Sequence, residues 1–98
     1  MKTIILDLTG CKTLWDIHER IRKAFHFPEW YGRSWDAFWD LLRTECDANK
    51  VIIKGEHTIP KEYEMHIEMM HSCFDDLINF RKENDKYVHA PFSYEIES

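Results

Sequence analysis

The sequence predicts a small α/β domain built from three parallel strands with helices between them. Two observations lead to this fold class. Short segments rich in β-branched or alternating apolar residues occur near the beginning, the middle and the end of the chain. Longer segments with apolar residues at helical spacing separate them. Strands separated by helices require crossover connections and therefore pair in parallel. We expect the first strand to be central, since this order needs only right-handed crossovers.

The first strand is expected over residues 4–8, where Ile, Ile and Leu precede a Thr-Gly turn. Thr13 is a suitable N-cap for the first helix, and Asp16 stands at its third position, where a carboxylate favours the helix dipole. Apolar residues then recur at helical spacing to about Phe25. Pro28 prevents the helix from continuing.

Ser34 can cap a second helix that runs from Trp35 to about Glu45. The second strand is Val51-Ile52-Ile53, and its uninterrupted apolar character is typical of a strand that is covered on both faces. A long third helix is expected to begin at Pro60 and to end at Asn84-Asp85. Its apolar stripe comprises Tyr63, Ile67, Met70, Phe74, Leu77 and Ile78. The third strand lies in the tail from Tyr87 to Glu97, where Phe92, Tyr94 and Ile96 alternate with polar residues.

Length and composition indicate one domain over residues 1–98, with 44% apolar residues for a modest core. The net charge of −5 makes nucleic-acid binding through phosphate neutralisation improbable. No signal peptide or membrane-spanning apolar run is evident, so we expect no membrane association. The three cysteines are widely spaced, which fits a reduced, cytoplasmic compartment.

Residues 27–42, FPEWYGRSWDAFWDLL, hold three of the four tryptophans, a tyrosine and two aspartates four positions apart. At 100° per residue, three apolar side chains of the second helix should face the core: Phe38, Leu41 and Leu42. Asp36 and Asp40 fall on the opposite side, with Trp35 and Trp39 at the boundary. Aromatic side chains dominate binding hot spots, and the adjacent carboxylates favour a positively charged partner. The segment therefore predicts a protein-binding surface.

Each aspartate also has a simpler interpretation. Asp36 is near the helix N-terminus, where it can interact favourably with the dipole. Asp40 can be a solvated charge paired with Arg43 three residues later, worth a few tenths of a kcal/mol.

Catalytic and metal-binding patterns are not evident, so we expect no enzyme activity and no cofactor or metal. Nothing near Asp36 and Asp40 would raise a carboxyl pKa for acid–base work. Cys46 has no accompanying catalytic motif and is more typical of a buried apolar residue. His66 and His71 are five residues apart, so their side chains diverge around a helix. Three scattered glycines provide no phosphate-binding loop.

The run from Leu14 to Asp40, LWDIHERIRKAFHFPEWYGRSWDAFWD, resembles the barstar family of ribonuclease inhibitors. The resemblance is strong over the first half of the chain and rests mainly on element order in the second half. It implies a three-stranded parallel sheet packed with about three to four helices. It also implies that the second helix and the preceding loop fill a ribonuclease active site, with Asp40 where an RNA phosphate would bind and Asp36 as a second acidic contact.

On this basis we expect a cognate ribonuclease with a basic active-site cleft as the partner. The expected contact residues are Trp30, Tyr31, Gly32, Ser34, Trp35, Asp36, Trp39, Asp40 and Arg43. Lys82 aligns with an interface glutamate of the family, and Glu83 follows it. A lysine would repel a basic cleft, which indicates that the target is a ribonuclease other than barnase. An immunity protein against a toxin, as in contact-dependent inhibition or other polymorphic toxin systems, fits this pattern. We expect a monomer alone and a heterodimer with the toxin. The alternative is a binding module of the same fold whose partner is not a nuclease.

Overall fold

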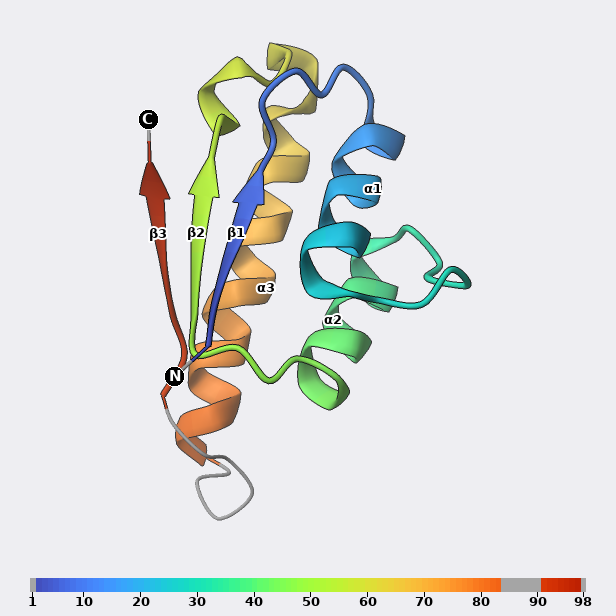
Figure 1. The fold of residues 1–98 in the computed structure, drawn as a ribbon. Helices are drawn as coiled ribbons and strands as arrows, with labels where there is room; N and C mark the ends of the chain where they lie inside the picture. Colours follow the sequence, from blue (N-terminus) through green and yellow to red (C-terminus); the bar gives the residue numbers. More distant parts are fainter. Residues whose placement is uncertain (1, 84–90, 98) are drawn as a thin grey trace.

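The computed structural model describes residues 2–83 and 91–97, which form a two-layer α/β domain (Figure 1). The strands are β1 (Thr3–Asp7), β2 (Lys50–Lys54) and β3 (Ser93–Glu97). The α-helices are α1 (Leu14–Phe25), α2 (Trp35–Thr44) and α3 (Glu64–Glu83). Two short 3-10 helices precede α3, η1 (Glu56–Thr58) and η2 (Lys61–Tyr63). The strands pair in parallel, which confirms the predicted fold class.

The strand order is β1-β2-β3, so the prediction of a central first strand is wrong. Figure 1 shows the three α-helices on the same side of the sheet. The strand order and the position of the helices on one side of the sheet are related, because crossover connections are right-handed. In the observed order both crossovers step in the same direction across the sheet, and right-handed connections then place all helices on one face. A central first strand would have reversed one step and covered both faces.

Burial along the strands shows the open face directly. Val51 and Ile53 of β2 are buried against the helices, whereas Ile52 between them is half-buried. Ile5 pairs with Ile52 on the open face and is 48% exposed. The prediction that β2 is covered on both faces is therefore wrong. On the open face of β2, Ile52 lies between two charged residues of the same strand, Lys50 and Lys54.

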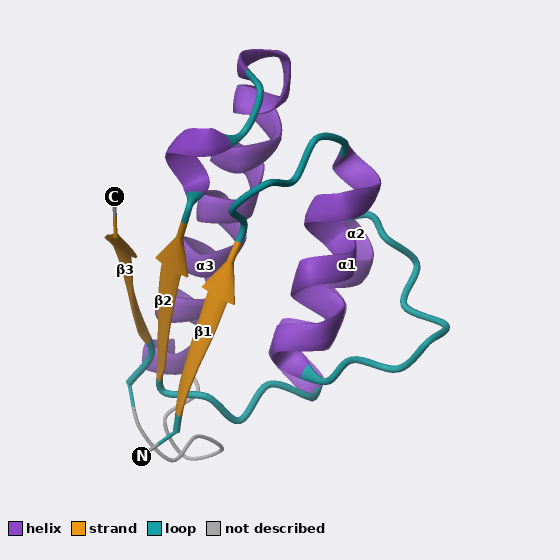
Figure 2. Cartoon of the chain, turned by 45° about the horizontal axis from the view of Figure 1, so that its top comes forward, coloured by secondary structure: helices purple, strands orange, loops and turns teal. Residues whose placement is uncertain are grey.

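The first two helices begin where the sequence predicts. Thr13 and Asp16 form a reciprocal capping box at the start of α1. At the other end of α1, His26 adopts a left-handed conformation with φ 58°, and its N–H bonds to the last turn. The Ser34 side chain accepts a hydrogen bond from the Ala37 N–H and caps α2. The connection between these helices projects from the helical layer (Figure 2).

The long helix α3 begins at Glu64, four residues later than predicted, because Pro60 leads into the 3-10 turn η2 instead. Most of the predicted stripe is buried, and Tyr63 and Ile78 are half-buried at its margins. Arg81 is also buried, and its guanidinium donates to the carbonyls of Ala48 (2.6 Å) and Cys46 (3.0 Å). The predicted helix end at Asn84-Asp85 and the predicted strand residues before 91 lie outside the described residues.

Candidate protein-binding surface

The loop of residues 26–34, which joins α1 to α2, is held to the core by its own side chains. Phe27 is buried and stacks on Phe25 with 5.3 Å between ring centroids. Tyr31 is 1% exposed, and its hydroxyl lies 2.6 Å from Nδ1 of the buried His18 of α1. The Tyr31 N–H donates to the Pro28 carbonyl at 3.0 Å and closes a tight turn. The loop therefore has a defined shape before any partner binds.

Arg33 fastens the end of this loop to α1. Its backbone has φ 50°, in the left-handed region. Its Nε donates to Glu19 Oε1 at 3.1 Å, its Nη1 donates to the Tyr31 carbonyl at 3.1 Å, and its guanidinium lies 4.1 Å from the Trp15 ring centroid. Hydrogen bonds from Arg33 and then from Arg22 hold the pKa of Glu19 below its usual range. The carboxylate thus remains charged and joins loop to helix.

The side chain of His18 in α1, which contacts the Tyr31 hydroxyl, is buried. Burial, with smaller contributions from the charges of His66 and Arg33, lowers the pKa of His18 to about 4. The ring is therefore neutral at pH 7 and packs 4.4 Å from the Trp35 ring, centroid to centroid. Its Nε2 atom has no hydrogen-bond partner in the described structure, so Tyr31 provides its one polar contact there.

Sequence reasoning did not identify His18 and Arg33 as parts of the site. A signal for His18 was available, because it lies on the apolar side of α1 next to Ile17 and Ile21, where a polar residue needs a buried partner. No local pattern marks Arg33, whose partners Glu19 and Trp15 lie on another element.

The aromatic residues expected at the surface divide into three groups. Trp30 is 75% exposed at the loop. Trp35 and Trp39 are half-buried at the boundary of α2, as predicted: Trp35 donates from Nε1 to His66 Nδ1 at 3.1 Å, and Trp39 meets the Phe80 ring edge-on at 6.1 Å. Tyr31 is a correction, since its buried ring is a loop anchor and does not face solvent. Gly32 is exposed, and a Cβ there would make an ordinary 3.4 Å contact with Ala37.

The carboxylates of α2 are exposed, and the apolar side of the helix is buried as predicted, with Phe38, Leu41 and Leu42 in the core. Asp36 lies in the first turn, where the helix dipole favours a negative charge. Asp40 forms an ion pair with Arg43, so the simpler interpretation of Asp40 is realised in the unbound chain. The Arg43 guanidinium also lies 5.5 Å from the Trp39 ring centroid.

Acidic charge continues from α2 onto the neighbouring α3. Cys73 of α3 faces α2, with its Sγ 3.9 Å from the Trp35 carbonyl oxygen. Burial, and then the negative charges of Asp76 and Asp36, raise the pKa of the Cys73 thiol to about 11. Asp76 is exposed like Asp36. Lys82 and Glu83 are both exposed in the last turn of α3. We call the exposed part of α2, with Trp30 and Asp76, the acidic-aromatic surface.

The cysteine thiols and the possible metal ligands are the groups to consider for reactivity, and the thiols are buried or partly buried. Burial raises the pKa of the Cys11, Cys46 and Cys73 thiols, which keeps them protonated at neutral pH. Within residues 2–83 and 91–97, no three His, Cys, Asp or Glu side chains are grouped so as to hold a metal ion. None of the described helices combines the length and apolar character needed to cross a membrane.

A known protein family and a named relative match most of this chain. The family model described as "Barstar (barnase inhibitor)" matches residues 1–91. The chain is also similar to a Bacillus subtilis (strain 168) protein named "Putative ribonuclease inhibitor YrdF", with 26% identity over 97 residues. That alignment covers 99% of this chain and 100% of the relative. Similarity therefore extends well beyond the first half of the chain.

Proposed function

The chain belongs to the barstar family of barnase inhibitors, and we propose that it inhibits a ribonuclease by filling the enzyme's active site with the acidic-aromatic surface. The observation that carries this proposal is the pair of exposed carboxylates on α2, Asp36 and Asp40, beside partly exposed indole rings. A ribonuclease needs a positively charged cleft to bind its polynucleotide. Anionic side chains placed there gain attraction, speed the encounter and exclude the substrate.

Each part of the surface has a distinct task in this proposal. The Asp40 carboxylate takes the position of an RNA phosphate, and Asp36 and Asp76 extend the negative potential around it. Trp30 and Trp39 supply rigid apolar contact area, which binds with little loss of conformational entropy. Gly32 and Ser34, which lie between Trp30 and Trp39 in the sequence, are small and exposed and would let the backbone of the partner approach closely.

The anchored loop favours a preorganised inhibitor. Tyr31 and Arg33 contact His18 and Glu19 of α1, and Arg33 also donates to the Tyr31 carbonyl, so these bonds would restrict the loop in the unbound chain. Preorganisation lowers the entropic cost of binding, so more of the interaction energy appears as affinity. The buried Tyr31, with the exposed Trp30 and Gly32 on either side of it, would serve this preorganisation.

We further propose that the partner is a ribonuclease toxin and that this chain is its immunity protein, acting in the cytoplasm as a monomer that forms a one-to-one complex. Contact-dependent inhibition toxins are one candidate class. The chain itself is proposed to have no catalytic activity. In support, burial raises the pKa of the three described cysteine thiols, which keeps them protonated and poorly nucleophilic at neutral pH.

An inhibition assay tests the proposal. Purified chain is titrated into barnase and into a panel of bacterial ribonuclease toxins, and initial rates of RNA cleavage are measured at several RNA concentrations. We expect at least one enzyme to be inhibited at a one-to-one ratio, with an apparent inhibition constant that rises with RNA concentration, because the two compete for one cleft. Inhibition that is independent of RNA concentration, or no inhibition of any enzyme, would contradict active-site blocking.

One observation favours the alternative of a binding module whose partner is not a nuclease. Arg43 pairs with Asp40 and reduces the negative charge that a basic cleft would meet. The variant Arg43→Ala separates the two functions. If the partner cleft is basic, removing this competing cation strengthens binding; if Arg43 itself contacts an acidic partner, the same variant weakens it.

A further inference from the structure

The side chain of Trp35, in the first turn of α2, is held by contacts from all three α-helices. Its ring centroid lies 4.4 Å from that of His18 on α1 and 5.7 Å from that of Phe38 on α2. From α3, His66 Nδ1 accepts a hydrogen bond from the indole N–H at 3.1 Å, and Cys73 Sγ lies 3.9 Å from the Trp35 carbonyl oxygen. His66 and Cys73 are seven residues apart and therefore lie on the same side of α3. This side of α3 contacts Trp35 at both its side chain and its backbone.

The hydrogen bond to His66 fixes the direction in which the indole points. The contacts with His18 and Phe38 are ring-to-ring contacts, which are less directional than a hydrogen bond. The indole has one polar atom, and its N–H can only donate. The ring planes of Trp35 and His66 are inclined by 28°, an orientation in which an N–H in the indole plane can meet a lone pair in the imidazole plane. The bond therefore selects one rotamer of Trp35 from those that the ring contacts allow.

This bond requires one protonation state of His66. Because the indole N–H is a donor only, Nδ1 of His66 must be unprotonated, and the neutral imidazole then carries its proton on Nε2. A proton on Nδ1 would set two donors against each other and release the indole. It would also place a positive charge beside Trp35, next to a surface that is proposed to meet a basic cleft. Both effects of protonation would therefore weaken binding.

Titratable groups from each neighbouring element lie near the half-buried His66. From α1 comes His18, which is neutral at pH 7 and close enough for its charge to interact with that of His66. From η2, the Tyr63 ring centroid lies 6.2 Å from the imidazole, and the exposed Glu62 precedes His66 by four residues. From α2, the exposed Asp36 directly follows the tryptophan. His66 is the group among them that bonds to the indole, so its own titration acts on the tryptophan most directly.

We propose, resting on the inhibitory function proposed above, that His66 is a positioning residue of the acidic-aromatic surface, whose neutral imidazole orients Trp35 for contact with the ribonuclease. Trp35 stands between Ser34, the cap of α2, and the exposed Asp36, so its half-buried ring borders the side of α2 that meets the partner. An indole already held in one rotamer loses little conformational entropy on binding. His66 thus contributes to affinity through Trp35, without touching the partner itself.

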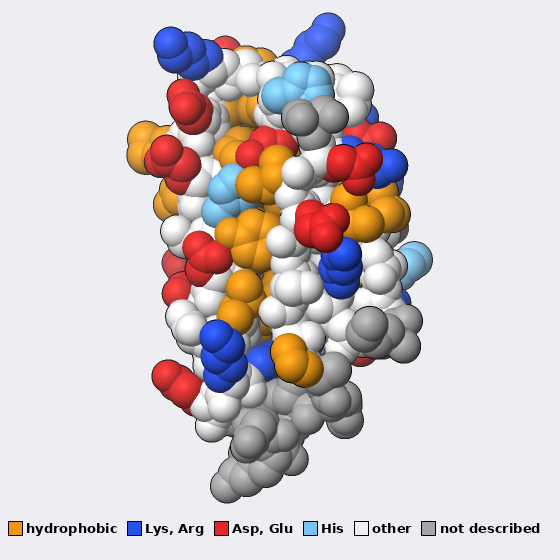
Figure 3. All heavy atoms as spheres, turned by 90° about the vertical axis from the view of Figure 1, so that its left-hand side faces the viewer, with side chains coloured by type: hydrophobic (Ala, Val, Ile, Leu, Met, Phe, Trp, Pro, Cys, Tyr) orange, Lys and Arg blue, Asp and Glu red, His pale blue; other side chains and the backbone are white. Residues whose placement is uncertain are grey.

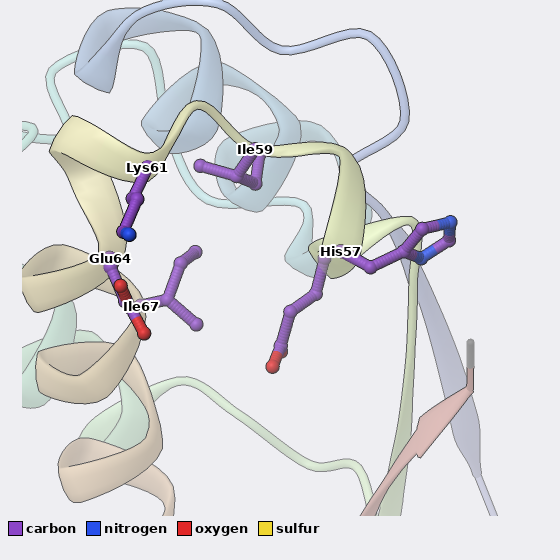
Figure 4. Close-up of a pocket in the computed structure, with 6 residues that line it drawn as sticks. His57, Ile59, Lys61, Glu64 and Ile67 are labelled. Carbon is purple, nitrogen blue, oxygen red and sulfur yellow. The ribbon is translucent and has the colours of Figure 1, made fainter.

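His71, five residues further along α3, provides a matched control. It is half-buried like His66, but its Nε2 lies 2.8 Å from Glu56 Oε2 and its ring centroid 5.8 Å from that of Tyr94 on β3. Figure 3 shows a histidine side chain among hydrophobic and acidic ones on the β3 side of the molecule. Glu56 also lines a hollow of about 380 Å³ at the first turns of α3 (Figure 4), and the residues around this hollow all lie outside the acidic-aromatic surface. Replacing His71 therefore changes an α3 histidine without changing the contacts of Trp35.

The test compares His66→Asn and His66→Leu with the parent and with His71→Asn. Asparagine has an amide oxygen bonded to Cγ, as Nδ1 is, whereas leucine has no acceptor. At about pH 8 the indole N–H resonance of Trp35, assigned by its absence in Trp35→Phe, should keep its shift in His66→Asn and move in His66→Leu. Inhibition of the ribonuclease should weaken about fivefold or more in His66→Leu and stay within about twofold of the parent in His66→Asn and His71→Asn.

A pH profile separates positioning from a purely structural role. Between about pH 8 and pH 5, where imidazoles titrate, the ratio of the parent's inhibition constant to that of His66→Asn should rise about threefold or more. The parent loses its acceptor by protonation and His66→Asn does not, while titrations of the ribonuclease and of His18 are common to both and cancel. A constant ratio, an unmoved Trp35 resonance in His66→Leu, or full inhibition by folded His66→Leu would each overturn the proposal. The resonance is measured without a ribonuclease, so failure of this contact is distinguishable from failure of the proposed inhibition.

Discussion

The variant Tyr31→Phe tests whether the loop before α2 is held by its buried anchor. The substitution removes one oxygen atom and leaves the ring volume almost unchanged, so it creates little cavity. It also removes the 2.6 Å contact with Nδ1 of His18, whose Nε2 already has no partner in the described structure. The imidazole would then be buried without any hydrogen bond, which costs about 1–3 kcal/mol. For a domain of this size, that loss lowers Tm by roughly 5–20 °C.

Differential scanning calorimetry at pH 7 measures the stability effect, and stopped-flow association with the cognate ribonuclease measures the effect on binding. We expect a lower Tm together with a slower association, because a looser loop is less often in its binding conformation. Tyr63→Phe is the matched control: Tyr63 is half-buried before α3 and should change neither quantity appreciably. If Tyr31→Phe melts within about 1 °C of the parent, the His18 contact does not hold the loop and this reasoning is refuted.

Three further predictions concern pH, salt and the second anchor. Because His18 has a pKa of about 4 when folded against 6.5 as its ordinary value, its contribution is complete above pH 6.5 and is lost as pH falls toward 4. This amounts to about 3 kcal/mol in urea denaturation. His71, whose pKa Glu56 raises, loses its stabilisation only as pH rises above 6.5, so it does not mask this change; an equal slope in His18→Gln would contradict the prediction. The association rate with the ribonuclease should fall about tenfold or more from low salt to ~0.5 M salt, with a nearly constant dissociation rate. An association rate that does not change with salt concentration would exclude a basic cleft. Arg33→Lys should slow association about threefold to tenfold, measured by surface plasmon resonance, because lysine cannot bridge Glu19 and the Tyr31 carbonyl together; an unchanged rate would show that Arg33 does not shape the loop.

The sequence predicted those parts of the fold that depend on local chemistry. The capping residues Thr13 and Ser34 set the starts of α1 and α2, because their hydroxyls satisfy nearby N–H groups. The strand order depends instead on the direction of each crossover, which leaves no local pattern. The open face of the sheet follows from that order, and so β2 could not be recognised as a strand covered on one face only.

In the candidate site too, features on one regular element could be predicted, and features that depend on contacts between elements could not. Helical periodicity correctly placed Asp36 and Asp40 in solvent and Phe38 in the core, since all three lie on one regular element. Tyr31 lies in a loop, where no periodicity predicts burial, and its partner His18 lies on α1, thirteen residues earlier. An aromatic side chain that looked like a contact residue therefore proved to be an anchor.

The most direct test measures both the inhibition constant and the Tm of Asp40→Ala. Glu68→Ala is the control, because it removes an exposed carboxylate from α3 that is not part of the acidic-aromatic surface. Asp40 is 67% exposed and paired with Arg43, and loss of such a helical pair costs about 0.2–0.5 kcal/mol, or no more than about 4 °C in Tm. If Asp40 occupies a basic active site, its removal weakens inhibition by about 2–5 kcal/mol, which is roughly 30- to 5,000-fold. An inhibition constant unchanged from the parent, or a large loss of Tm with full inhibition, would contradict the assignment of α2 as the inhibitory element.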